Sequence, residues 1–266
     1  MVGAYAVKIR YRDEVNVGIV GTDTMVTTML ATGEIVDNPS AQQVELALSL
    51  CESEMISTMV AGASSALTQK HLADLKLTAS EDVLKLVDLS PVPITVTGSP
   101  GSWSWETGES YGVAGFTSTS PNDALPQRAS AANVLDQDGD GNPGVSVRFS
   151  GEYEGDLYLA LAYRYQFAGD LADAAEITGK AESGSREKLF GGLVENIDKV
   201  IENFGVRAED FGIQIGGNDA AVLSAFLLTE MSRQASPETS DNTVKLVKQD
   251  RALDCSEVIA RKGELF

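Results

Sequence analysis

Apolar and polar residues alternate along much of the chain, and the longest such stretch covers residues 157–167. Because successive side chains of a strand point to opposite faces, this stretch predicts a strand with one wholly apolar face. Eleven alternating residues are long for a sandwich and typical of an antiparallel barrel or a strongly curved sheet. The apolar face consists of Leu157, Leu159, Leu161, Tyr163, Tyr165 and Phe167.

Several shorter stretches have the same period of two. Residues 4–12 place Tyr5, Val7, Ile9 and Tyr11 on one face and basic residues on the other, which predicts a half-buried strand. Further strands are expected as a hairpin over residues 15–30 and over residues 44–51, 220–231 and 244–248.

Residues 185–205 follow a different spacing, with apolar residues every three or four positions and Gly205 as a stop signal. We therefore expect one helix here. The pattern as a whole predicts a mainly β protein, an antiparallel barrel or strongly curved sheet with one or two accessory helices. It is expected to form a single domain over residues 1–255, followed by a polar tail over residues 256–266.

An acidic turn separates two of the predicted strands. Asp136, Asp138 and Asp140 occupy alternate positions before Gly141, as in the first half of an EF-hand loop. Ca²⁺ prefers six to eight oxygen ligands, and a tight turn gathers three carboxylates around one point. Asn142 would add its backbone carbonyl. We therefore expect a structural calcium ion at Asp136, Asp138, Asp140 and Asn142.

The turn departs from an EF-hand at its twelfth position, where Val147 replaces the bidentate glutamate. A helix-loop-helix unit is therefore not expected, and the missing oxygens must come from water or from nearby acidic residues. The alternative is an acidic turn without a metal. Calcium is favoured because three carboxylates so close together repel one another unless a cation lies among them.

The charge narrows the set of partners. Acidic residues outnumber basic ones by 39 to 20, for a net charge of −19 over 266 residues. Such a surface repels phosphate backbones and anionic headgroups, so we expect no nucleic-acid partner and no electrostatic docking to membranes. The pattern also contains no transmembrane segment, and the start of the chain has no signal peptide. Either the protein is cytosolic or the sequence starts at the mature chain; we prefer a secreted or periplasmic protein.

Cys51 and Cys255 are the only cysteines. They either form one disulfide between the two ends of the domain or remain free thiols in a cytosolic protein. The calcium-like turn and the acidity both suit an oxidising compartment, and they favour the disulfide.

The run from Leu135 to Arg148, followed by Gly155 to Tyr158, matches D-x-D-G-D-G-x-P-G-V-x-V-R before a G-[DE]-L-Y strand. In these two segments the chain resembles uncharacterised secreted or lipoprotein-like proteins of the bacterial envelope. The resemblance implies a location at the cell envelope and a β-rich fold. It implies no activity, because that family has none to transfer.

Two features suggest ligands. The apolar strand face at Leu159, Leu161, Tyr163 and Tyr165 is expected to bind an apolar small molecule or lipid beneath the helix at 185–205, unless it only lines a core. Trp103 and Trp105 share one face of a strand, which is the arrangement of a platform for a glycan; the alternative is a pair of core tryptophans.

Three function classes follow. The first is a calcium-stabilised, non-catalytic binding protein for an apolar small molecule or lipid. The second is a carbohydrate-binding or adhesive module that uses Trp103 and Trp105, or a surface-interaction domain without a small ligand. The third is a glycosidase that works with carboxylates alone. No catalytic residue is assigned, because His71 is the only histidine and no G-x-S-x-G, phosphate-loop or zinc motif is present.

Overall fold

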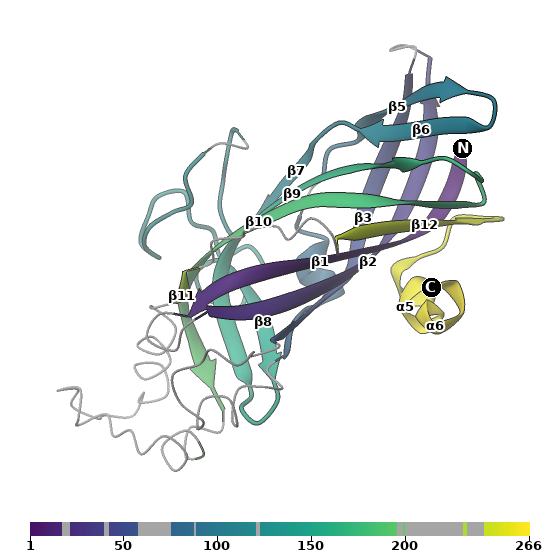
Figure 1. Ribbon diagram of the computed structural model, residues 1–266. Helices are drawn as coiled ribbons and strands as arrows, with labels where there is room; N and C mark the ends of the chain where they lie inside the picture. The colour runs from purple at the N-terminus through teal and green to yellow at the C-terminus, as the bar shows by residue number, and fades with distance from the viewer. Residues whose placement is uncertain are drawn as a thin grey trace, which may run out of the picture.

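The computed structural model describes residues 1–17, 22–39, 43–57, 76–87, 89–120, 123–195, 199, 231–232 and 242–266. Its dominant feature is one large antiparallel sheet that closes on itself (Figure 1). The mainly β fold with a few short helices is therefore confirmed. No helix among these residues is long and apolar enough to cross a membrane.

The structure contains twelve described strands and three described short helices, and the alternating stretches at residues 4–12, 157–167 and 244–248 all lie in strands. The strands are β1 Gly3–Val17, β2 Thr22–Asn38, β3 Gln43–Ser57, β4 Lys76–Ala79, β5 Val92–Ser99, β6 Ser102–Thr107, β7 Ser110–Ala114, β8 Val145–Ser150, β9 Gly155–Asp170, β10 Glu176–Val194, β11 Met231–Ser232 and β12 Thr243–Gln249. The helices are α2 Glu81–Leu84, α5 Cys255–Ala260 and α6 Lys262–Leu265.

The strands form a closed ring in the order β10-β12-β1-β2-β3-β4-β8-β9, and β9 pairs back with β10. At the opposite end of the long strands, β5 and β6 replace β4 and β8 as the link between β3 and β9. Figure 1 shows β5 and β6 at one end of the sheet and β8 at the other. Closure leaves few unpaired strand edges, which is how a β protein avoids edge-to-edge association.

The interior of the ring is the main hydrophobic core. The alternating apolar residues of β1 and β9 are buried there, as the sequence pattern predicts, together with inward residues of the other strands. Examples are Tyr5, Val7, Ile9, Tyr11, Leu157, Leu159, Leu161, Tyr163, Tyr165 and Phe167. Helix α2 adds Val83 and Leu84 to the same core.

The helix expected over residues 185–205 is wrong in its first half, because residues 185–194 belong to strand β10. The strand pairs with β9 along almost its whole length. A bulge at Phe190 breaks the alternation, since Leu189 pairs with Leu159 and Gly191 with Tyr158. At this bulge the adjacent residues Leu189 and Phe190 pack in different places, Leu189 against the core and Phe190 against an outer cluster. Residues 196–198 and 200–205 lie outside the described residues, as do 220–230 of the expected closing strand.

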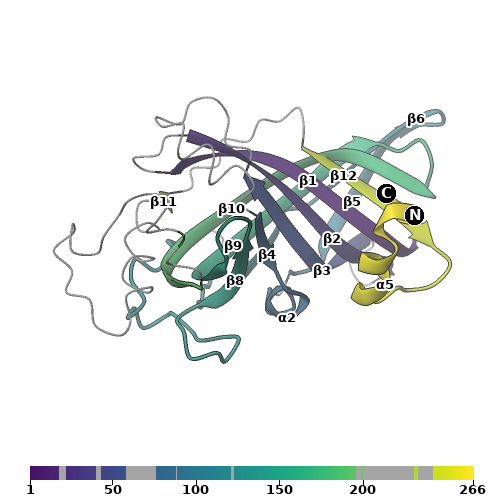
Figure 2. The same cartoon turned by 90° about the horizontal axis from the view of Figure 1, so that it is seen from below.

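The expected polar tail is also wrong. Helices α5 and α6 form a clasp, residues Cys255–Leu265, on the outer face of β1, β2 and β3. Its Val258 and Leu265 pack on Ala6 and Leu30. The alternation in residues 4–12 placed Ala6 on the same face as the basic residues, so its burial was not expected. Figure 2, a view from below, shows α5 close to the chain start and outside the ring.

A bulge in β3 directs Cys51 toward the clasp. Leu50 pairs with Ala31 and Glu52 with Leu30, so Cys51 is the extra residue. It forms a disulfide with Cys255, with a Cα–Cα distance of 5.0 Å. The predicted disulfide is therefore confirmed, and it links the middle of the ring to the clasp.

Candidate functional site

The acidic turn lies between β7 and β8, and its two ends are joined at the base. Asp136 forms a bridge with Gly144, whose N–H donates to the Leu135 carbonyl at 2.7 Å. Gly144 has a φ of 98°, and a Cβ there would lie 2.2 Å from the Leu159 carbonyl oxygen. Only glycine fits this position, which holds the turn directly against β9.

Gln137 anchors the turn to the rest of the molecule. Its side-chain carbonyl accepts the Gly115 N–H at 2.7 Å, and its amide donates to the Leu86 carbonyl at 3.3 Å. Leu86 lies two residues after α2 and Gly115 directly follows β7, so the Gln137 side chain links three segments of the chain. The alternation of the turn thus directs Gln137 inward and leaves the aspartates exposed.

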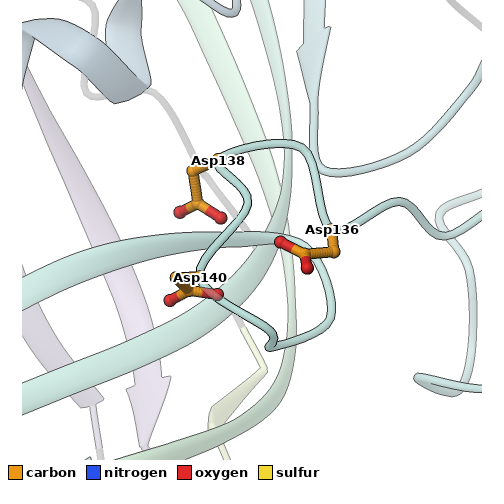
Figure 3. A group of neighbouring side chains, drawn as sticks. All are labelled: Asp136, Asp138 and Asp140. Atoms are coloured by element: carbon orange, nitrogen blue, oxygen red, sulfur yellow. The ribbon is translucent and has the colours of Figure 1, made fainter.

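The three aspartates come together as the sequence predicts. One carboxylate oxygen from each of Asp136, Asp138 and Asp140 lies within 4.8 Å of the others, and all three residues are exposed. Figure 3 shows the three carboxylates around one bend of the turn. Backbone N–H groups hold them: Gly141 donates to Asp136 at 3.0 Å and Ser146 donates to Asp138 at 2.7 Å.

Asp140 is the most strongly held of the three. Burial by itself would raise its pKa, but hydrogen bonds from the Ser146 hydroxyl and from Asn142 outweigh it, so the pKa is lowered. Both the backbone and the side-chain amide of Asn142 donate to Asp140, at 2.8 and 3.1 Å. The amide NH₂ of Asn142 therefore supports a carboxylate, and its backbone carbonyl remains the expected ligand.

The downstream acidic residues have another partner. Glu154 and Asp156 each lie 3.5 Å from the guanidinium of Arg148, which also pairs with Glu195. An ion in the turn would thus be held by three carboxylates, and the remaining oxygens would come from backbone carbonyls and water. Ca²⁺ accepts this kind of mixed set.

The proposed apolar ligand face is part of the packed core. Leu159, Leu161, Tyr163 and Tyr165 are each at most 5% exposed. The enclosed space beside the first three measures about 10 Å³, which leaves room for no more than a single water molecule. The helix expected to cover this face is a strand up to Val194, so among the described residues these four side chains pack against their neighbours in the core.

The two tryptophans do not form a platform. Trp105 is 2% exposed, and its indole N–H donates to the Thr178 carbonyl at 3.4 Å, so it belongs to the core. Trp103 is 40% exposed. The expectation that both rings face a glycan is therefore wrong, and Trp103 alone remains accessible.

An open groove of about 620 Å³ lies over β5, β6, β9 and β10. It is lined by Thr97, Ser104, Trp105, Glu106, Ala168, Gly169, Asp170, Thr178, Gly179 and Lys180. No sequence pattern predicts this groove, because its charged residues Glu106, Asp170 and Lys180 come from three strands and form no motif. The only local signal was the proximity of Glu106 to the two tryptophans.

The chain matches no protein-family model, and no curated protein or solved structure is significantly similar to it. Its class rests on the fold and the site: a closed antiparallel sheet with a filled interior, one disulfide and one acidic turn. His71, the only histidine, lies outside the described residues.

Proposed function

We propose that this chain is a calcium-stabilised, non-catalytic binding protein of the cell exterior or periplasm. The observation that carries the proposal is the turn that gathers Asp136, Asp138 and Asp140 within 4.8 Å. Carboxylates this close repel one another, and a hard divalent cation removes the repulsion while accepting their oxygens.

The position of the turn gives the ion a structural role. Gln137 hydrogen-bonds to the residue after β7 and to the segment after α2. This region adjoins the two pairs of short strands, β4 with β8 and β5 with β6, that link β3 to β9 and complete the ring. Calcium there would strengthen the part of the wall with the shortest strands. The ion is thus proposed to stabilise the fold, and no reaction step is assigned to it.

Two further features support a location outside the cytoplasm. The Cys51–Cys255 disulfide suits an oxidising compartment. The resemblance of the acidic turn to envelope proteins points to the same place.

A binding role fits the outer surface better than the interior. The open groove over β6, β9 and β10 offers room that the core lacks. Glu106 and Asp170 are exposed in this groove, without the dry, enclosed setting that a glycosidase gives its acid. Binding is therefore preferred to hydrolysis, and an apolar ligand is no longer proposed.

Thermal unfolding with calcium and with excess EDTA tests the proposal. With calcium at about a hundred times its dissociation constant, binding adds about 2.7 kcal/mol, which corresponds to a rise in Tm of roughly 5–10 °C. In Asp138→Asn, the amide oxygen can still accept the Ser146 N–H but the charge is lost. We expect this variant to be at least as stable as wild type in EDTA and to gain much less from calcium.

Asp250→Asn is the matched control, because it removes the same charge from an exposed position away from the turn. It should respond to calcium as wild type does. An equal Tm in calcium and EDTA for the wild-type protein would show that the turn holds no structural ion and would overturn the proposal.

A further inference from the structure

A second hollow on the outer surface lies where the clasp meets the sheet. We call it the clasp pocket; it measures about 330 Å³ and is lined by Lys8, Thr28, Leu30, Glu52, Glu54, Lys262, Gly263 and Phe266. The first five residues come from β1, β2 and β3, and the last three from α6 and the residue after it. The outer face of the sheet therefore forms the floor of the pocket, and the clasp forms one wall.

Strand register places all the lining residues of the sheet on one face. Two rows of directly paired residues cross β1, β2 and β3: Lys8, Leu30 and Glu52 form one row, and Arg10, Thr28 and Glu54 form the next. Directly paired residues of antiparallel strands point to the same face. Leu30 identifies it as the outer face, because it packs against the clasp. Side chains from both rows can therefore reach one ligand.

The charges of the two rows are separated by strand. β1 carries the cations Lys8 and Arg10, β3 carries the carboxylates of Glu52 and Glu54, and β2 between them contributes only uncharged residues. Neighbouring strands lie about 4.8 Å apart, so the cationic and anionic sides are separated by about 10 Å at the backbone. The pocket thus has a positive side and a negative side.

The cationic side has no carboxylate of its own. In the described part of the chain neither Lys8 nor Arg10 forms an ion pair, and the Lys8 ammonium lies 5.8 Å from the centre of the Phe266 ring. The cross-strand neighbour of Lys8 on β12 is Lys245, and like charges directly opposite each other are destabilising. Lys245 has Glu176 at 3.3 Å. A carboxylate bound beside Lys8 and Arg10 would therefore be stabilised by both.

The anionic side can accept further hydrogen bonds. Lys262 lies 3.0 Å from the Glu52 carboxylate, and Lys76 pairs with Glu54. A carboxylate has about four acceptor positions, so each of the two can accept another N–H beside its lysine. Their side chains are only 22% and 25% exposed, which limits competition from water.

We propose that the clasp pocket binds a free α-amino acid with an apolar side chain. Its carboxylate accepts hydrogen bonds from the cations of β1, and its ammonium donates to the carboxylates of β3. Its side chain lies against Leu30 and the ring of Phe266. A volume of about 330 Å³ is at the small end of the usual range for ligand sites, as a small ligand requires. The inference gives a ligand class to the binding role proposed above and rests on it.

The pocket favours a zwitterion over an ion of either sign. A simple anion would bind at β1 but would face the carboxylates of β3, on a chain with a net charge of −19. A simple cation would face Lys8 and Arg10. A zwitterion satisfies both sides of the pocket and adds no net charge.

Isothermal titration of the purified full chain with phenylalanine, phenylpropionate and phenylethylamine tests the proposal. Phenylpropionate lacks the ammonium and phenylethylamine lacks the carboxylate, while all three share the aromatic body. We expect phenylalanine to bind and each analogue to bind at least about tenfold more weakly, because each loses one charge-assisted contact.

Two variants assign the contacts. Lys8→Gln should raise the dissociation constant of phenylalanine by about tenfold and leave that of phenylethylamine unchanged, since that ligand has no carboxylate to lose. Glu54→Gln should weaken phenylalanine and not phenylpropionate. The matched controls are Lys248→Gln and Glu34→Gln, which remove the same charges from exposed positions outside the pocket and should bind as wild type does. Thermal unfolding without ligand checks that each variant is folded.

Three outcomes would overturn the inference: no heat from phenylalanine at millimolar concentration, equal affinity for phenylalanine and either analogue, or unchanged affinity in both pocket variants. The titration is repeated in EDTA below the unfolding temperature. Binding that persists there, in a protein whose Tm ignores calcium, would support the pocket and refute the ion. A calcium-dependent Tm without phenylalanine binding would do the reverse.

Discussion

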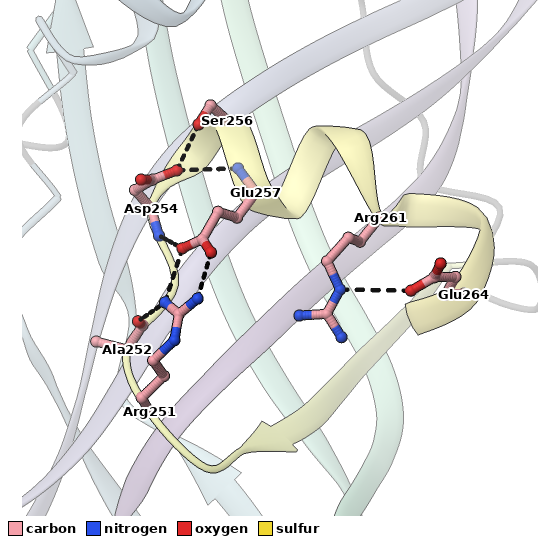
Figure 4. A network of polar contacts seen from close by, with 7 residues as sticks. All are labelled: Arg251, Ala252, Asp254, Ser256, Glu257, Arg261 and Glu264. Carbon is pink, nitrogen blue, oxygen red and sulfur yellow. Dashed lines mark hydrogen bonds and ion pairs between the residues drawn. The ribbon is translucent and has the colours of Figure 1, made fainter.

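Glu257 shows how a single residue organises the clasp. Its carboxylate accepts the backbone N–H of Asp254 at 3.2 Å and pairs with Arg251, while the Asp254 side chain accepts the Glu257 N–H at 2.9 Å. This reciprocal capping box starts α5 (Figure 4). The hydrogen bond from Arg251 is the main reason that the pKa of Glu257 falls to about 2.

The lowered pKa predicts how the clasp responds to acid. A carboxylate whose pKa is lower in the folded state stabilises the fold above its unfolded pKa, near 4.5, and this contribution is lost as the pH falls toward about 2. The difference in Tm between wild type and Glu257→Gln should therefore be constant near neutral pH and shrink between pH 4.5 and 2.

Thermal unfolding across this pH range measures the difference. Glu264→Gln is the control, because the side chain of Glu264 is 76% exposed and lies 3.4 Å from Arg261. Its Tm should stay close to that of wild type throughout. A Glu257→Gln difference that grows in acid would contradict the assignment.

At the scale of the element, two of the glycines of β10, Gly179 and Gly191, lie in different surroundings. Gly179 faces Trp105 and the carbonyl of Ala168, where a Cβ would meet the oxygen at 2.5 Å. Gly191 lies near the bulge, and its nearest neighbour is a ring atom of Tyr158 at 3.6 Å. Replacing each glycine with alanine therefore distinguishes two effects: a steric clash where two strands approach closely, and the general effect of replacing a glycine within a strand.

Gly179→Ala should destabilise the protein by about 1–3 kcal/mol, the usual cost of overpacking a close contact. Gly191→Ala should stay within about 0.5 kcal/mol of wild type. Chemical denaturation monitored by tryptophan fluorescence measures both, and it also reports the environment of Trp105. Equal effects at the two positions would show that the close approach of β9 and β10 at Gly179 does not need a glycine.

At the scale of the molecule, the disulfide joins residues 204 positions apart. It attaches the clasp to β3. The clasp in turn covers the apolar residues Ala6 and Leu30 on the outer face of the sheet. The chain-entropy model gives about 5 kcal/mol for closing so long a loop. The bond is therefore expected to be one of the largest single contributions to stability.

Replacing both cysteines with serine should lower Tm by roughly 10–20 °C, as expected for a loss of this size in a chain of this length. Limited proteolysis should then cut first within the clasp, because Val258 and Leu265 lose their covalent attachment. An unchanged Tm would show that packing alone holds the clasp. Lys262→Ala, which removes only the ion pair with Glu52, is the control and should cost little.

The local sequence pattern was enough to predict the strands in which one face is apolar and the other polar. In β1 and β9 the alternating apolar residues face the core, as the two-residue period of a strand predicts. Ala6, Ala160 and Ala162 on the opposite face are buried as well, in two outer clusters that the pattern does not predict. The gathering of Asp136, Asp138 and Asp140 was predictable for a similar reason. A short turn closed between Asp136 and Gly144 brings its own side chains together without help from distant parts of the chain.

The helix expected at residues 185–205 shows where the pattern misleads. The apolar residues Leu189, Phe190 and Leu193 have helical spacing, but pairing with the long edge of β9 places them in a strand. The bulge sends Phe190 to an outer cluster with Phe116 and leaves Leu193 41% exposed. Non-local pairing overrode local preference here.

The sequence by itself determined the β class, the buried faces of the leading and central strands and the acidic turn, because each depends on residues close together in the chain. Only the tertiary structure decided the closure of the ring, the bulge that turns Cys51 outward, the clasp and the groove. Each of these joins residues far apart in sequence. Their positions follow from strand register, which no local pattern encodes.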